Sequence, residues 1–169
     1  MWLVPADAAA DTVLKTAFLK LTGGAQGEPR DLVIKGRNLH VPRAAHGVAW
    51  FSFHDLCEQP LAASDYLRLA HDYHTIVLDH VPVMDYDQRN AAKRFITLID
   101  TLYDNAVKLI ASAAADPTSL YRATDGVEAN EFKRTSSRLI EMGSESYLAL
   151  PHGRRDSTAS GASTGLVET

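Results

Sequence analysis

Cysteine and long apolar runs are scarce in this sequence. Cys57 is the single cysteine among 169 residues, and no apolar run approaches the length of a membrane span. One thiol cannot form a disulfide within the chain, so a reducing compartment is expected. A membrane-spanning helix needs about 20 apolar residues, and the N-terminal segment lacks the basic start and apolar stretch of a secretion signal. These absences predict a soluble, cytoplasmic protein without a transmembrane segment.

Positive charge is also in short supply. The chain has 17 lysine and arginine residues against 21 aspartate and glutamate residues, which gives a formal net charge of -4. Proteins that bind nucleic acids normally present a basic surface to the phosphate backbone. Nucleic acid is therefore not an expected partner.

Several nucleotide-binding and redox motifs are missing. The sequence contains no GxxxxGK[ST] loop, in which backbone N–H groups and a lysine enclose nucleotide phosphates. Gly23, Gly24 and Gly27 do not supply such a loop, and neither GxGxxG nor CxxC occurs. We therefore expect that this chain alone neither binds nor hydrolyses ATP, and we assign it no catalytic residue.

The remaining composition is that of one globular domain. Hydrophobic residues make up 46% of the chain and charged residues 22%, which is enough apolar surface to build a core. The exception is residues 151–169, a segment rich in serine, threonine, glycine and alanine. We predict a folded domain over residues 1–150 and a disordered tail over residues 151–169.

The first half of the chain predicts a helix followed by a small antiparallel sheet. Asp7 is a suitable N-cap, Gly23 and Gly24 end the helix, and its apolar residues recur at helical spacing: Val13, Leu14, Ala17, Phe18 and Leu21. Three short apolar runs follow, at 32–34, 39–41 and 48–53, separated by turns at 36–38 and 45–47. This alternation predicts a three-stranded antiparallel meander.

The middle of the chain predicts a strand–helix–strand unit. A short helical turn over 55–59 and a helix capped by Ser64, ending near His71, precede it. The segments 74–78 and 107–112 are typical of buried strands, and residues 87–103 carry the clearest apolar helical stripe: Ala92, Phe95, Ile96, Ile99, Leu102 and Tyr103. Two strands joined by a helix favour a parallel pair with a right-handed crossover.

The C-terminal part predicts a short helical turn from Asp116 to Tyr121 and then a helix over residues 130–148. Phe132, Leu139, Ile140, Gly143 and Tyr147 are expected to face the core. Together these elements predict an α/β fold with an N-terminal helix, a meander, a strand–helix–strand unit and a C-terminal helix.

The histidines raise the question of a metal site. His71, His74, Asp79 and His80 lie close together in the sequence and are possible metal ligands. His71 and His74, however, straddle a predicted helix-to-strand boundary, whereas a helical pair of ligands needs fixed spacing on one face. Packing and hydrogen bonding are the favoured interpretation, and no metal site is assigned.

An acidic and a basic feature remain near the C-terminus. Leu98-Ile99-Asp100 is similar to the apolar run ending in aspartate that holds magnesium in P-loop enzymes, but the stripe places Asp100 within a helix. Arg134 and Arg138 lie four residues apart, on one helical face. They are either paired locally, with Glu141 or Glu145, or reach a nucleotide phosphate or a neighbouring subunit.

Several segments, read in order, carry a family resemblance. They are residues 51–57 (FSFHDLC), 65–67 (DYL), 73–78 (YHTIVL), 81–84 (VPVM), 94–104 (RFITLIDTLYD), 107–113 (VKLIASA) and 134–142 (RTSSRLIEM), followed by Ser144 and Tyr147. The combination resembles the C-terminal part of the ZapE (AFG-like) family of AAA+-related P-loop ATPases. Tyr73 replaces the expected phenylalanine, and Lys93 stands where a second arginine is common.

The resemblance carries expectations about function. In the family, the P-loop and the magnesium-binding motif lie upstream of the part that resembles this chain, so the chain is expected to be a fragment of an ATPase. ATP and magnesium are then cofactors of the full-length family and not of this chain alone. Arg134 and Arg138 match the family segment RTxSRLxEM, which implies contact with a nucleotide or a subunit interface.

The resemblance also implies partners and a location. The expected partners are the upstream ATPase half or whole ATPase subunits, together with cell-division proteins, at the cytoplasmic side of the division site. Two alternatives stay open. The chain is a non-catalytic interaction module that binds through the meander and Trp50, or a metal-dependent hydrolase built on His71, His74 and Asp79.

Overall fold

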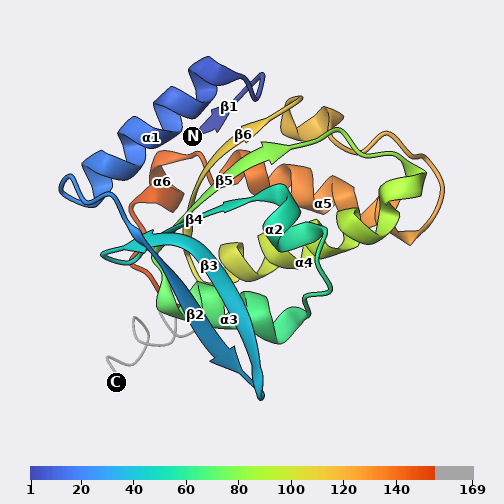
Figure 1. The fold of residues 1–169 in the computed structure, drawn as a ribbon. Coiled ribbons are helices and arrows are strands. Elements are labelled where there is room, and N and C mark those ends of the chain that lie inside the picture. Colours follow the sequence, from blue (N-terminus) through green and yellow to red (C-terminus); the bar gives the residue numbers. More distant parts are fainter. Residues whose placement is uncertain (155–169) are drawn as a thin grey trace, which may run out of the picture.

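The computed structural model describes residues 1–154, which form an α/β fold around a six-stranded sheet (Figure 1). The strands are ordered β1-β6-β5-β4-β3-β2. Their bounds are Trp2–Leu3 (β1), Glu28–Ile34 (β2), Arg37–Ala45 (β3), Val48–Ser52 (β4), Thr75–Val81 (β5) and Lys108–Ala113 (β6). The helices are Ala8–Leu21 (α1), Phe53–Cys57 (α2), Ala63–Asp72 (α3), Arg89–Asp104 (α4), Val127–Glu141 (α5) and Glu145–Leu148 (α6), with short 3₁₀ turns at Tyr86–Gln88 (η1) and Pro117–Ser119 (η2).

The sheet has a parallel half and an antiparallel half. Strands β1, β6, β5 and β4 pair in parallel, and α4 makes the crossover between β5 and β6. Strands β4, β3 and β2 pair in antiparallel order, which confirms the predicted meander. The predicted α/β class and the strand–helix–strand unit are also confirmed.

Helix α1, drawn in blue in Figure 1, packs on one face of the sheet against β5 and β6. The Asp7 carboxylate caps the helix by accepting from the Ala10 N–H at 2.9 Å. Leu14 and Phe18 are fully buried against Val48 and Val77 of the sheet. Burial of such side chains stabilises the fold by about 1.5–3 kcal/mol each.

The opposite face of the sheet is covered by α2, α3, α4 and α5, and it holds the larger core (Figure 1). Helix α4 is central because it packs against both α3 and α5. An aromatic series joins these elements: Phe53 of α2 contacts Phe95 of α4, and Phe95 stacks on Phe132 of α5 with ring centroids 5.9 Å apart. The position of α5 relative to α4 is therefore fixed by close packing.

Both hairpin turns of the meander use a residue with positive φ followed by glycine. Lys35 (φ 50°) and Gly36 (φ 79°) join β2 to β3, and His46 (φ 47°) and Gly47 (φ 80°) join β3 to β4. Positive φ at both central residues is the requirement of a type I′ turn. The first turn therefore lies one residue earlier than the predicted turn at 36–38.

The C-terminal helix differs most from its prediction. Residues 130–148 form two helices and not one, because the chain leaves α5 at Met142 and the Ser144 hydroxyl caps α6 by accepting from the Tyr147 N–H. The change of direction leaves Ile140 and Gly143 exposed, although both were expected to face the core. Phe132, Leu139 and Tyr147 are buried as predicted.

Smaller differences concern the buried face of α1, the start of α3 and the N-terminus. Val13 and Leu21 are exposed on α1, whose buried stripe is narrower than its apolar pattern. Ser64 lies inside α3, where the Asp65 carboxylate accepts from the Ala62 N–H instead. The two-residue strand β1 is too short to leave a periodic pattern, and the sequence did not predict it.

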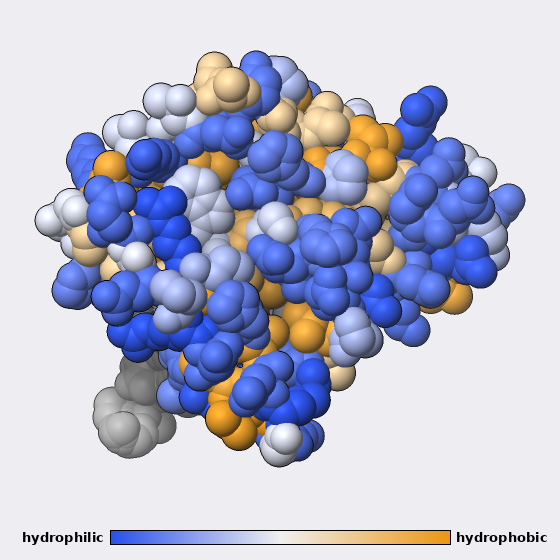
Figure 2. All heavy atoms as spheres, viewed as in Figure 1, coloured by the Kyte–Doolittle hydropathy of each residue, from blue (hydrophilic) through white to orange (hydrophobic). Residues whose placement is uncertain are grey.

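The C-terminal prediction falls mostly outside the described residues. His152 and Gly153 hydrogen-bond to Ala70 and Asn105 of the domain, and the rest of the predicted tail, from residue 155, lies beyond the described part. Within residues 1–154, no helix is long and apolar enough to cross a membrane. On the face drawn in Figure 2, hydrophilic side chains predominate, with smaller apolar areas between them.

Candidate anion-binding site on helices α4 and α5

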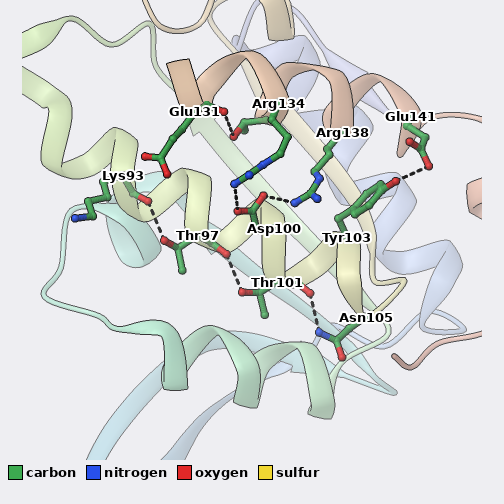
Figure 3. Close-up of polar contacts among 11 residues, drawn as sticks. Lys93, Thr97, Asp100, Thr101, Tyr103, Asn105, Glu131, Arg134, Arg138 and Glu141 are labelled. Atoms are coloured by element: carbon green, nitrogen blue, oxygen red, sulfur yellow. Dashed lines mark hydrogen bonds and ion pairs between the residues drawn. The ribbon is translucent and has the colours of Figure 1, made fainter. Parts of the chain in front are cut away.

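Arg134 and Arg138 converge on one carboxylate, that of Asp100 (Figure 3). Arg138 Nη1 donates to Asp100 Oδ1 at 2.5 Å, and Arg134 Nη2 donates to Asp100 Oδ2 at 2.9 Å. The four-residue spacing places both arginines on the side of α5 that faces α4, and Asp100 lies on the adjoining side of α4. The predicted shared face of the two arginines is therefore present.

Tyr103 forms one wall of this site. The Arg138 guanidinium carbon lies 4.7 Å from the centroid of the Tyr103 ring, a cation–π distance. The Tyr103 hydroxyl donates to Glu141 Oε2 at 2.8 Å (Figure 3). Arg138 is thus held between a carboxylate and an aromatic ring.

The two arginines differ in exposure. The Arg138 and Asp100 side chains are each 25% exposed, whereas the Arg134 side chain is 53% exposed. One carboxylate balances one of the two cations, so the Asp100–Arg134–Arg138 group has a net charge of +1. A cationic group with N–H donors near solvent is suited to bind an oxyanion.

The structure corrects the expected local partners of these arginines. Glu141 and Glu145 were the candidates for pairing, but the carboxylate that pairs with both arginines is Asp100, 38 residues from Arg138 and 34 from Arg134. Glu141 lies one turn farther along α5 and accepts from Tyr103. A partner on another helix leaves no signal in the spacing of a single helix, so the sequence did not reveal it.

Asp100 lies within α4, as the helical stripe predicted. It does not stand at the carboxyl end of a strand, where the magnesium-binding aspartate of a P-loop enzyme is found. Its two oxygens are both used by arginines. The geometry therefore gives Asp100 the role of an arginine partner.

The three residues of the metal-site alternative are not brought together. His74 contacts Thr75 and the His46 carbonyl, and His71 pairs with Asp72. Asp79 lies near the other end of β5. Among residues 1–154, no group of three or more histidine, cysteine, aspartate or glutamate side chains is arranged to hold a metal ion.

Trp50, the residue proposed for an interaction surface on the meander, is engaged within the chain. Its indole N–H donates to Asp79 Oδ2 at 2.7 Å, and its ring lies 5.8 Å from that of Phe18. Arg43 stacks on both rings, 5.1 Å from the Trp50 centroid and 4.8 Å from the Phe18 centroid. These contacts give Trp50 a structural role on the α1 face of the sheet.

The single thiol is also enclosed. Cys57 is fully buried at the end of α2, and burial raises the pKa of its thiol well above the ordinary value. A buried thiol of raised pKa is a poor nucleophile. Cys57 is therefore a core residue, and the arginine site remains the candidate functional site.

Comparisons with known proteins found one matching family model and several relatives. The sequence model of the family described as AFG1-like ATPase matches residues 1–151. The cell division protein ZapE of Escherichia coli is 34% identical over 152 residues, which cover 90% of this chain and 40% of ZapE. An uncharacterized protein of Schizosaccharomyces pombe is 34% identical over 147 residues, which cover 72% of this chain and 32% of that protein.

A vertebrate relative gives a similar result. Lactation elevated protein 1 homolog B of Danio rerio is 32% identical over 151 residues, which cover 70% of this chain and 30% of the relative. The chain therefore spans about a third of the length of the curated relatives that it matches. No solved structure matches the chain significantly.

Proposed function

Because this chain belongs to the AFG1-like ATPase family, we propose that it supplies the arginine-bearing part of an ATPase whose phosphate-gripping loop lies in another segment. ATP and magnesium would be held by that other segment, since this sequence contains no GxxxxGK[ST] loop. The function of this chain is then to complete a nucleotide site. On its own, it hydrolyses no ATP.

The observation that carries the proposal is the convergence of Arg134 and Arg138 on Asp100. Two guanidinium groups share a single carboxylate, and the site is partly open to solvent. Surface ion pairs of this kind contribute only about 0–1 kcal/mol to stability. The contribution of these ion pairs to stability therefore does not account for two arginines at one carboxylate.

Arginine has a known use in phosphoryl transfer. Negative charge accumulates on the transferred phosphoryl group, and an arginine that reaches it stabilises the transition state. In this chain, Arg134 and Arg138 would donate N–H groups to phosphate oxygens of a nucleotide gripped elsewhere. No proton transfer or nucleophile is required from the chain for this role.

We extend the proposal to partners and location. The ZapE relative is named a cell division protein, and a role in bacterial cell division is proposed for this chain by that similarity. Its partners would be the upstream ATPase half or whole ATPase subunits, and cell-division proteins at the cytoplasmic side of the division site. Neither nucleic acid nor a metal ion is required by the site.

The proposal is tested with a chimera. The part of E. coli ZapE that this chain does not match is joined to residues 1–169, and ATP turnover is measured beside that of the chain alone. We expect turnover by the chimera and none above buffer for the chain. Substitution of both Arg134 and Arg138 by alanine should lower kcat by about 1,000-fold, the lower end of the effect of an arginine that contacts the transferred phosphoryl group.

Lys133→Ala is the matched control, since Lys133 is an exposed cation on the same helix. It should leave kcat within about 2-fold of the parent chimera, because an exposed surface charge contributes little. Equal turnover by the parent chimera and its Arg134, Arg138 double variant would contradict the proposal, as would ATP turnover by the chain alone.

A further inference from the structure

We propose that Asp100 is a positioning residue and that, of the two arginines, Arg134 is the one that contacts the phosphate. This inference rests on the proposed function and assigns separate roles within the same site. Its basis is the unequal environment of the two guanidinium groups, which share one carboxylate but little else.

Arg138 is fixed on two sides. Its Nη1 donates to Asp100 Oδ1, and its guanidinium group stacks on the Tyr103 ring (Figure 3). Tyr103 is itself held by its hydrogen bond to Glu141 and by an edge-on contact with the Tyr147 ring, 5.8 Å away. Movement of Arg138 toward a ligand would break contacts with both Asp100 and Tyr103.

Arg134 is held at one point only. Its Nη2 donates to Asp100 Oδ2, and within residues 1–154 its Nε and Nη1 have no hydrogen-bond partner. The side chain is twice as exposed as that of Arg138. Arg134 therefore keeps donors for an incoming oxyanion while Asp100 still holds it.

The role of Asp100 follows from electrostatics. Two cations four residues apart on a helix repel each other, and each side chain has several rotatable bonds. The shared carboxylate offsets much of this repulsion and draws both guanidinium groups toward α4. Without it, Arg134 would sample many directions, and fewer of them would reach a phosphate at a fixed place.

The ligand class is a phosphate oxyanion of a nucleotide bound by another segment. The N–H donors of a guanidinium group lie in one plane, at a spacing that lets two of them bind two oxygens of a phosphate. Asp100 balances one of the two cations, which leaves a net charge of +1 to meet an oxyanion that another segment holds. This agrees with a chain that grips no phosphate by itself.

The first test uses the chain alone and does not depend on ATP turnover. We would measure ¹⁵N relaxation of the arginine Nε–Hε groups in the parent chain and in the Asp100→Asn, Asp100→Glu and Asp104→Asn variants. Asp104 is an exposed carboxylate one turn along α4, which makes it a matched control. Asp100→Asn should mobilise Arg134, Asp100→Glu should partly restore its order, and Asp104→Asn should change nothing. An equally ordered Arg134 in Asp100→Asn would overturn the positioning role.

The second test uses kinetics of the ZapE chimera. Arg134→Ala should lower kcat by at least about 100-fold, and Arg138→Ala or Asp100→Asn by only about 10-fold, because an arginine in contact with the phosphoryl group carries the larger effect. KM for ATP should stay within about 2-fold, because the nucleotide is gripped elsewhere. In the Arg134→Ala background, Asp100→Asn should have no further effect, since Asp100 acts through Arg134.

The outcomes separate this inference from the proposed function. A chimera that loses turnover with Arg138→Ala but keeps it with Arg134→Ala would overturn the assignment and leave the proposed function intact. A chimera that is insensitive to loss of both arginines would overturn both. Independent, multiplicative effects of Arg134→Ala and Asp100→Asn would overturn the positioning role alone.

Discussion

Two arginine–aspartate sites of this protein show how burial changes the role of an ion pair. Arg37, at the tip of the β2–β3 ribbon, contacts Asp65 of α3 at 2.5 Å, and the Asp65 side chain is 0% exposed. Arg134 and Arg138 contact Asp100, which is 25% exposed. The first site has a buried charge that depends on a single cation, and the second has one more cation than it needs.

The buried site connects two elements. Asp65 Oδ2 accepts from Arg37 and from the Ala62 N–H, while Asp65 Oδ1 is buried without a hydrogen-bond partner among the described residues. From the other side, Arg68 of α3 donates to the Val33 carbonyl of β2. These contacts hold the β2–β3 ribbon against α3.

The surroundings of the charges at a site decide its role more than the number of charges does. Removal of one partner of a buried pair leaves a charge without compensation, which is costly, whereas an exposed pair is screened by water. The Arg37–Asp65 site should therefore respond to mutation in stability, and the Arg134–Asp100–Arg138 site should respond in function.

The largest expected effect is that of Arg37→Ala. It leaves Asp65 buried without its cation and should lower the free energy of unfolding by about 2 kcal/mol, less than the 3–5 kcal/mol typical of fully buried pairs because Arg37 is 43% exposed. Urea unfolding of the parent and variant proteins measures this change in the free energy of unfolding. Lys15→Ala, an exposed cation of α1, is the control and should change stability by less than about 0.5 kcal/mol. An equal effect of the two substitutions would remove the contrast between the sites.

A second substitution tests the physical reason for that loss of stability. In the Arg37→Ala background, Asp65→Asn removes the uncompensated charge and keeps an oxygen that can accept from the Ala62 N–H. The double variant should therefore be more stable than Arg37→Ala alone, by about 1 kcal/mol. If it is less stable, the cost of Arg37→Ala does not come from the buried charge.

Substitutions in the Arg134–Asp100–Arg138 site should have a smaller effect on stability. Arg134→Ala and Asp100→Asn should each change the free energy of unfolding by less than about 1 kcal/mol, as measured by urea unfolding. Added salt at about 0.5 M should reduce the difference further, because exposed charges are screened. A loss as large as that of Arg37→Ala would show that this site is structural and would weaken its functional assignment.

The smallest expected effect is a pH dependence at His80. A hydrogen bond to Asp79 raises the pKa of His80, with help from the charges of Asp79 and Asp11 and against partial burial. This contribution to stability is fully present below the ordinary pKa of about 6.5 and is lost as pH rises through the raised value.

Comparison of parent and His80→Asn unfolding at pH 6 and pH 8.5 measures this contribution. Asparagine is the preferred substitute because His80 has a φ of 58°, which asparagine tolerates. The difference in stability between the two proteins should be greater at pH 6. A greater difference at pH 8.5 would contradict the sign.

The sequence predicted the elements whose signal is local. The meander and the unit of β5, α4 and β6 follow from apolar periodicity and from turns with glycine, and they were predicted correctly. The break between α5 and α6 was missed because the Ser144 cap competes with a helical pattern that continues to Tyr147. The strand β1 was missed because two residues are too few to show the alternation of apolar and polar side chains that is typical of a strand.

The site was predicted only in part, for the same reason. The spacing of Arg134 and Arg138 placed them on one face, but the sequence offered Glu141 and Glu145 as partners. Asp100 became their partner only when α5 packed beside α4, through contacts such as Phe95 on Phe132. A contact between helices depends on tertiary packing, which the spacing within one helix does not report.

In the proposed function, this chain brings an arginine to a nucleotide that another segment binds. The most direct test is a structure of the ZapE chimera with magnesium and a non-hydrolysable ATP analogue. We expect a guanidinium nitrogen of Arg134 within about 3 Å of a phosphate oxygen, the distance of a charge-assisted hydrogen bond. A bound nucleotide whose phosphates contact neither Arg134 nor Arg138 would contradict the claim.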